Sequence, residues 1–134
     1  MRTRYGQPEG LPEPLGHYSH VAVVPGLLFV AGQVAVDEAG ATVGAGDFEA
    51  QMRQVYGNLE RALASEGAAF EDVAKFTTFL AREEDIDAFY KVRRALYPAL
   101  FPKGRYPANT LVVVDRLVRE EFLIEVEAVA ALAG

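Results

Sequence analysis

FLIEVEAVAA, residues 122–131, is the stretch of this sequence that decides the fold. All of its positions are apolar except Glu125 and Glu127. Side chains of a strand alternate between two faces, so the two glutamates share one face. A half-exposed strand normally carries more polar residues on its open side than this one does. We therefore expect a sheet with helices on one face and a second copy of the chain packed against the other.

Further back in the chain, residues 18–36 predict a β-hairpin. They are rich in Val, Ala, Leu and Phe, and they are interrupted once by Pro25-Gly26, a pair that favours a tight turn. Asp47 is a favourable N-cap, and apolar residues then recur at helical spacing until a stop at Gly67. The sequence therefore predicts a hairpin followed by a helix.

The second half of the chain predicts a strand, a helix and two further strands. Residues 73–80 are β-branched and aromatic, whereas residues 84–97 return to helical spacing and end before Pro98. Residues 110–115 and 122–131 complete the order ββ, α, β, α, ββ. Two helices and a mostly apolar sheet indicate an α+β fold, a two-layer sandwich with both helices on one face.

Size and composition limit the classes of function. With 134 residues, about half of them apolar, residues 1–134 predict a single domain, in which the Pro- and Gly-rich residues 1–16 form an irregular N-terminal arm. The net charge of −6 and the scattered basic residues disfavour a nucleic-acid partner. No apolar stretch approaches the roughly 20 residues that span a bilayer, so we expect a cytoplasmic protein without membrane association. The absence of cysteine excludes thiol chemistry.

Few residues are available for nucleophilic or metal chemistry. The sequence has neither a G-x-S-x-G elbow nor an H-E-x-x-H helix. His17 and His20 are expected on opposite faces of a strand, where they would not share a metal ion, and we interpret them as surface histidines. We therefore expect no metal site and no bound cofactor.

Carboxylates on the last strand are the more informative candidates. Burial would raise the pKa of Glu125 or Glu127 toward the range useful for general acid–base catalysis, and the neighbouring like charge would act in the same direction. A solvated or ion-paired strand face explains the same pattern equally well. Asn109 and Thr110 lie where a loop enters a strand, a common position for ligand contacts, although a simple turn explains them nearly as well.

Four blocks of the sequence resemble the RidA (reactive intermediate deaminase A, or YjgF) family, in order and in spacing. The resemblance runs from about Gly16 to the C-terminus. The blocks are GHYS at 16–19 against the family's G-P-Y-S, FVAGQ at 29–33 against F-V-S-G-Q, DVAKFTTFL at 72–80 against D-V-V-K-T-T-V-F-L, and IEVEAVA at 124–130 against I-E-I-E-A-I-A.

The resemblance implies a chorismate-mutase-like fold and a homotrimer whose sheets face inward, with small-molecule pockets in the clefts between subunits. It also implies an imine or enamine deaminase, a hydrolase acting on C=N that converts reactive 2-imino acids to 2-oxo acids and ammonia without metal or cofactor. In such enzymes an arginine binds the substrate carboxylate and a glutamate positions the attacking water. A guanidinium matches a carboxylate with two hydrogen bonds, so this division of roles is chemically sound.

Carried over by position, the resemblance assigns catalysis to Glu125 and substrate contacts to Tyr18 and Gly32. Asn109, followed by Thr110 as a further contact, stands where the family has its arginine. Loss of a charge-assisted pair to a carboxylate would cost about 2 to 5 kcal/mol, which lowers the expected activity.

Another difference lies on the second helix, where an asparagine of many relatives aligns with Arg93. We hypothesise that the two residue types have changed places, so that Arg93 supplies the positive charge and Asn109 a neutral hydrogen bond. A solvated Arg93 is the alternative, and Arg105 is another possible donor.

Three functions follow, in order of preference. The first is a RidA-like protein whose pocket persists and whose imine hydrolysis is weak, altered or absent. The second is a non-catalytic, metabolite-binding or regulatory trimer with a carboxylate-bearing ligand. The last is a ribonuclease or translation inhibitor, which the acidic composition disfavours.

Overall fold

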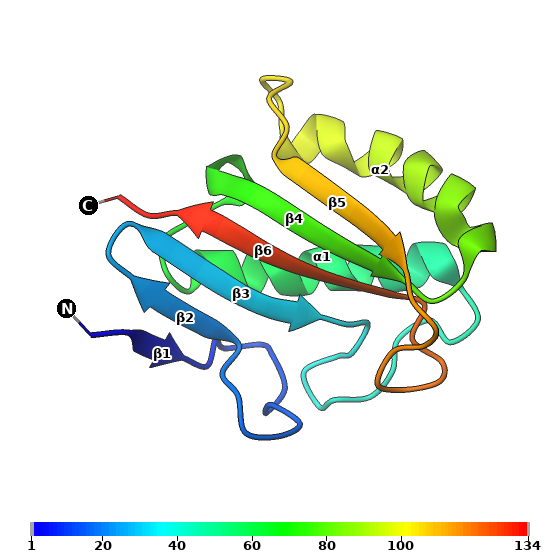
Figure 1. Ribbon diagram of the computed structural model, residues 1–134, viewed down its shortest axis with the longest axis horizontal. Coiled ribbons are helices and arrows are strands. Elements are labelled where there is room, and N and C mark those ends of the chain that lie inside the picture. Colours follow the sequence, from blue (N-terminus) through cyan, green and yellow to red (C-terminus); the bar gives the residue numbers. More distant parts are fainter. Residues whose placement is uncertain (1, 134) are drawn as a thin grey trace.

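A computed structural model describes residues 2–133, which form six strands and two α-helices (Figure 1). Two 3-10 turns, Phe70–Asp72 and Glu83–Asp85, precede β4 and α2. In chain order the elements are β1 Arg4–Gly6, β2 Val21–Val24, β3 Leu27–Gln33, α1 Phe48–Ala64, β4 Val73–Leu80, α2 Ile86–Leu100, β5 Ala108–Val113 and β6 Ile124–Ala131.

All six strands belong to one mixed sheet, in the order β1-β2-β3-β6-β4-β5. Only β4 and β5 run parallel, and every other neighbouring pair is antiparallel. The last strand in the sequence, β6, therefore lies between β3 and β4 near the middle of the sheet (Figure 1). The strand β6 thus pairs with β3 along one edge and with β4 along the other.

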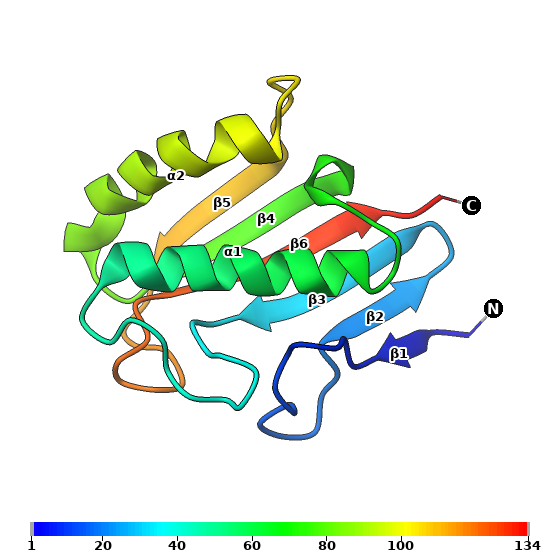
Figure 2. The same ribbon diagram turned by 180° about the vertical axis from the view of Figure 1, so that it is seen from behind.

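Both helices pack on the same face of this sheet, as the view from behind shows (Figure 2). Met52, Val55 and Leu59 of α1 are fully buried, as are Ile124 and Val126 of β6. The alternation of buried and less buried residues along β6 assigns every second position, from Ile124 to Ala130, to the helix side. The predicted α+β two-layer sandwich, with two helices on one face, is confirmed.

Local sequence explains the first elements. Gly26 has a φ of +81°, which glycine adopts without strain, and with Pro25 it makes the two-residue turn that joins β2 to β3. The side chain of Asp47 accepts a hydrogen bond of 3.1 Å from the backbone N–H of Ala50 and caps α1, as predicted.

Most element bounds shift by two or three residues from the prediction, and three of the differences have a clear physical reason. Residues 4–6 of the arm form β1, because Arg4 binds Glu66 at 2.7 Å and the backbone pairs with the free edge of β2. The helix α2 continues past Pro98 to Leu100, since a proline in the last turn removes only one helical hydrogen bond. Strand β5 begins at Ala108, two residues earlier than predicted, because it pairs with β4 from Lys75 onward.

The prediction that His20 is a surface histidine on a strand is wrong. The strand begins at Val21, and the arm folds over the imidazole, which is 6% exposed. Its Nε2 lies 2.7 Å from the carbonyl oxygen of Pro12, and its Nδ1 lies 3.3 Å from the side-chain nitrogen of Gln33. His17, by contrast, is exposed.

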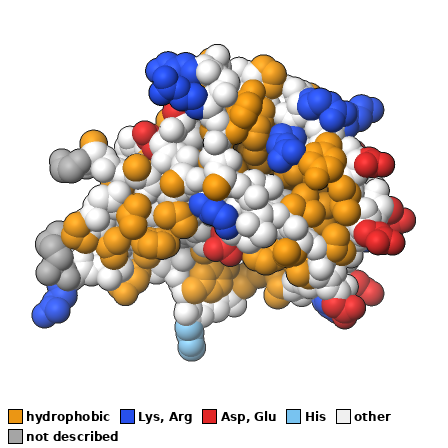
Figure 3. Space-filling model, turned by 45° about the horizontal axis from the view of Figure 1, so that its top comes forward, with side chains coloured by type: hydrophobic (Ala, Val, Ile, Leu, Met, Phe, Trp, Pro, Cys, Tyr) orange, Lys and Arg blue, Asp and Glu red, His pale blue; other side chains and the backbone are white. Residues whose placement is uncertain are grey.

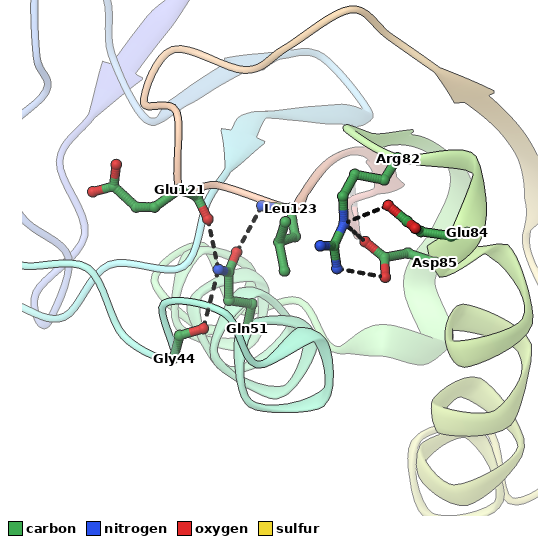
Figure 4. A network of polar contacts seen from close by, with 7 residues as sticks. All are labelled: Gly44, Gln51, Arg82, Glu84, Asp85, Glu121 and Leu123. Atoms are coloured by element: carbon green, nitrogen blue, oxygen red, sulfur yellow. Dashed lines mark hydrogen bonds and ion pairs between the residues drawn. The ribbon is translucent and has the colours of Figure 1, made fainter.

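One buried side chain joins α1 to the start of β6 (Figure 4). The amide nitrogen of Gln51 donates to the carbonyls of Gly44 and Glu121 at 3.1 and 2.8 Å, and its oxygen accepts from the N–H of Leu123 at 2.8 Å. Because Leu123 immediately precedes β6, this contact holds the entry into the strand that carries Glu125.

No part of residues 2–133 covers the sheet face opposite the helices, and much of this face is apolar (Figure 3). Tyr5, Leu27, Phe29 and Val112 are exposed. Within residues 2–133, no helix is both long and apolar enough to cross a membrane.

Candidate functional site

Glu125 is the carboxylate that the sheet places in the most distinctive environment. It projects from β6 onto the open face and is half-buried, whereas Glu127, two residues on, is exposed. The end of β3 lies alongside, and a Cβ atom at Gly32 would stand only 2.8 Å from the carboxyl carbon of Glu125. The absence of a side chain at Gly32 therefore makes room for the glutamate.

Burial raises the pKa of Glu125, and the negative charge of Glu127 raises it further. Both causes that were expected from the sequence operate in the structure. A carboxylate with a raised pKa next to open space can accept a proton from water near neutral pH better than an ordinary surface glutamate can.

A second polar site lies on the other side of the sheet, between α2 and β5. Here a pocket of about 400 Å³ is lined by side chains of both elements and of the loop that joins them. The lining residues are Arg93, Arg94, Tyr97, Pro98, Tyr106, Pro107 and Asn109. Arg93 and Asn109, which the sequence hypothesis linked, thus lie in one pocket.

Asn109 has a defined orientation in this pocket. The hydroxyl of Thr78 on β4, which is fully buried, donates a hydrogen bond of 2.8 Å to the side-chain oxygen of Asn109. The amide nitrogen of Asn109 makes no hydrogen bond within residues 2–133, so it is available to donate to a ligand oxygen.

Arg93 is held by aromatic rings. Its guanidinium lies 5.0 Å from the ring centroids of Phe89 and of Tyr90, and 5.9 Å from that of Tyr97. The Tyr97 hydroxyl meets that of Tyr56 at 2.7 Å. Burial raises the pKa of Tyr97, while the hydrogen bond with Tyr56 and the charge of Arg93 oppose this increase.

The six predicted site residues do not form one site within a chain. Asn109 pairs with Phe76 of β4, which in turn pairs with Ala128 of β6. Because Ala128 is three residues from Glu125, Asn109 lies about 10 Å from Glu125 along the strand direction. Ala128 and Glu125 also point to opposite faces, because their positions differ by an odd number. The sheet therefore separates Glu125 and Gly32 from Arg93 and Asn109.

Tyr18 and Thr110 belong neither to the α2–β5 pocket nor to the contact between Glu125 and Gly32. Thr110 stands on the open face, level with Thr77 and Glu127. Tyr18 lies between the arm and β2, four strand positions from β5, and its hydroxyl accepts a hydrogen bond of 3.3 Å from the N–H of Leu15. A site that includes Tyr18 and Asn109 would need two chains.

Among the residues that sequence reasoning missed, Tyr97 and Tyr106 line the α2–β5 pocket and Thr78 orients Asn109 within it. Tyr97 could have been found, because it follows Arg93 by four positions and the two share a helix face. Thr78 and Tyr106 carried no such signal, because their approach to Asn109 and to α2 depends on strand order and on loop path. Among residues 2–133, no three His, Asp or Glu side chains gather as a metal site would require.

Comparisons with known proteins agree over nearly the whole chain. The family model described as Endoribonuclease L-PSP matches residues 9–132. The chain is 38% identical over 133 residues to the RutC family protein slr0709 of Synechocystis, covering 98% of each chain. It is 34% identical to 3-aminoacrylate deaminase RutC of Acinetobacter baylyi, covering 92% of this chain and 93% of that protein.

A solved structure shows the same fold. The crystal structure of the YjgF gene product of E. coli superimposes with a TM-score of 0.85 at 25% identity, covering 96% of this chain and 98% of the other. The sequence motifs, the sheet with two helices on one face and these matches lead to one conclusion: the chain belongs to the RidA/YjgF family.

Proposed function

We propose that this protein hydrolyses 2-imino acids, or their enamine tautomers, to 2-oxo acids and ammonia. The observation that carries the proposal is the half-buried Glu125, which has a raised pKa and lies against the side-chain-free Gly32 on an open sheet face. One relative carries the name 3-aminoacrylate deaminase, which supports a deaminase in this family.

In the proposed reaction, the Glu125 carboxylate holds a water molecule and accepts a proton from it as its oxygen adds to the C=N carbon. The nitrogen takes up this proton and then the proton of the new hydroxyl, the C–N bond breaks as the C=O bond forms, and ammonia leaves a 2-oxo acid. The reaction consumes one water and transfers no electrons, so we expect it to need no redox cofactor.

We assign the substrate carboxylate to Arg93 and Asn109. The guanidinium of Arg93 supplies the positive charge, and the free amide nitrogen of Asn109 supplies a second hydrogen-bond donor. Together they replace the arginine that the family has at the position of Asn109. Because the sheet separates these residues from Glu125, we propose that one protomer supplies Glu125 and Gly32 and its neighbour supplies Arg93 and Asn109.

The open sheet face supports such an assembly. Phe29 is 42% exposed and Leu27 is 38% exposed, in the middle of a sheet that the chain's own helices cover on one side only. Hydrophobic side chains spread over this face in Figure 3. Burial of these side chains against a second copy would be favourable. We propose a homotrimer with the sheets facing inward.

To test the proposal, an amino-acid oxidase generates 2-imino acids with small, aromatic and basic side chains, and their hydrolysis by the protein is followed. A family member that has the strand arginine serves as the positive control. We expect turnover that is lost in Glu125→Ala. Turnover that persists in this variant would contradict the assignment of Glu125.

A non-catalytic, metabolite-binding trimer is the second candidate, because Asn109 contributes no charge to the pocket. Binding of 2-oxo acids without any imine hydrolysis would favour it. The description of the family model names an endoribonuclease, but a net charge of −6 makes a phosphate-binding surface unfavourable. Salt-sensitive RNA binding would revive that function.

A further inference from the structure

We infer that the substrate of this protein carries a second carboxylate at the end of its side chain, which Arg94 binds while Arg93 binds the first. This inference rests on the anion-binding role proposed above for the α2–β5 pocket. It names the substrate class as 2-imino acids, or 2-oxo acids, with acidic side chains.

The charge of the pocket is the first observation. Of the described residues, two arginines and no carboxylate line it, in a chain with 19 acidic and 13 basic residues. Arg4, Arg53 and Arg82 each pair with a carboxylate. Neither Arg93 nor Arg94 forms an ion pair or a hydrogen bond with any residue from 2 to 133. Two adjacent positive charges without a counter-ion favour a ligand that brings two negative charges.

The polar groups around these arginines also favour an anion. The oxygen of Asn109 is occupied by the Thr78 hydroxyl, so the amide presents its nitrogen. The hydroxyl of Tyr97 is paired with that of Tyr56. With these contacts made, the pocket offers mainly hydrogen-bond donors, which is the pattern that carboxylate oxygens require.

The two guanidiniums reach the pocket from different directions. Consecutive helix residues are about 100° apart around the axis, so Arg93 and Arg94 do not lie parallel. The rings of Phe89, Tyr90 and Tyr97 hold the half-buried Arg93, whereas Arg94 is exposed. This arrangement suits two carboxylates separated along one carbon chain better than a single carboxylate shared by both arginines. Figure 3, in which the α2 side is turned forward, shows Lys and Arg side chains beside apolar ones there.

The test is calorimetric titration of the full-length protein with 2-oxoglutarate and with 2-oxopentanoate, which have the same carbon skeleton and differ in the terminal carboxylate. We expect 2-oxoglutarate to bind about tenfold more tightly, as an added charge-assisted contact would give. Arg94→Gln should abolish this preference and leave binding of 2-oxopentanoate within about twofold of its original value. Lys91→Gln removes the same charge from an exposed position of α2 outside the pocket, and it should keep the preference.

Equal affinity for the two acids, or a preference that Arg94→Gln does not change, would overturn the inference. The absence of binding by either acid would overturn it as well. Hydrolysis of imines with uncharged side chains is measured separately, so the proposed function can stand while this inference fails.

Discussion

At position 32, one methyl group is predicted to displace the candidate catalytic carboxylate. The Cβ atom of Gly32→Ala would stand 2.8 and 3.0 Å from Cδ and Cγ of Glu125, so the glutamate must change rotamer. We expect imine hydrolysis to fall at least about tenfold while the melting temperature changes little. Steady-state kinetics and thermal unfolding of the same sample measure the two effects.

Gly57 provides the matched control for this substitution. It lies within α1, and a Cβ atom there meets nothing within 4 Å. Gly57→Ala should leave hydrolysis unchanged and raise the free energy of unfolding by about 0.5 to 1 kcal/mol, because alanine favours the helix. Equal activity of the two variants would show that the contact between Gly32 and Glu125 is irrelevant to the chemistry.

The raised pKa of Glu125 has a consequence for stability. Glu125 binds its proton more tightly in the folded chain than in the unfolded chain, in which glutamates titrate at about pH 4.3. The resulting stabilisation is present below that pH and is lost as the pH rises through the folded-state pKa. Glu125→Gln should therefore raise the melting temperature more at pH 7 than at pH 4. Glu60→Gln, an exposed change on α1, is the control for net charge. An increase of the same size at both pH values would contradict the burial argument.

Among the elements, the junction between α1 and β6 depends on Gln51. Gln51→Leu would leave the carbonyls of Gly44 and Glu121 and the N–H of Leu123 without their partner. We expect the free energy of unfolding to fall by about 2 to 4 kcal/mol, measured by urea denaturation. Arg53→Leu on the same helix removes only a surface ion pair with Glu49 and should cost less than about 1 kcal/mol. Similar losses in both variants would argue against the buried network.

The elements that sequence predicts well are those with local causes. The turn at Pro25-Gly26 and the cap at Asp47 act within a few residues, and both were predicted. The bounds of β5 and the burial of His20 depend on partners distant in sequence, namely β4 and the arm. Periodicity carries no information about such partners, and for this reason these predictions were shifted or wrong.

The same distinction applies to the candidate site. The motif FVAGQ and the last strand each contain one of its members, but only the pairing of β3 with β6 brings Gly32 against Glu125. The sequence linked Arg93 and Asn109 through family resemblance, and in the structure both line the α2–β5 pocket. Neither periodicity nor motif showed that the sheet separates this pair from Glu125.

For the whole molecule, the open face makes a prediction about assembly. Phe29→Glu adds a charge to the middle of this face, where a buried carboxylate would be strongly unfavourable. Light scattering should change from a mass of about 44 kDa, three times the 14.6 kDa of one chain, to that of a monomer. Ala64→Glu adds the same charge to the helix layer, and it should leave the mass unchanged. A trimer that survives Phe29→Glu would place the subunit contact elsewhere.

The central claim is that each site combines Glu125 of one protomer with Arg93 of its neighbour. It is tested most directly by co-expressing Glu125→Gln and Arg93→Gln chains with different affinity tags and purifying the mixed trimers through both tags. In a cyclic trimer that contains both chains, one of the three interfaces joins an intact Glu125 to an intact Arg93. Each variant alone should be inactive, and the mixed trimers should recover about a third of the wild-type hydrolysis rate. Mixed trimers as inactive as their parents would contradict the shared site.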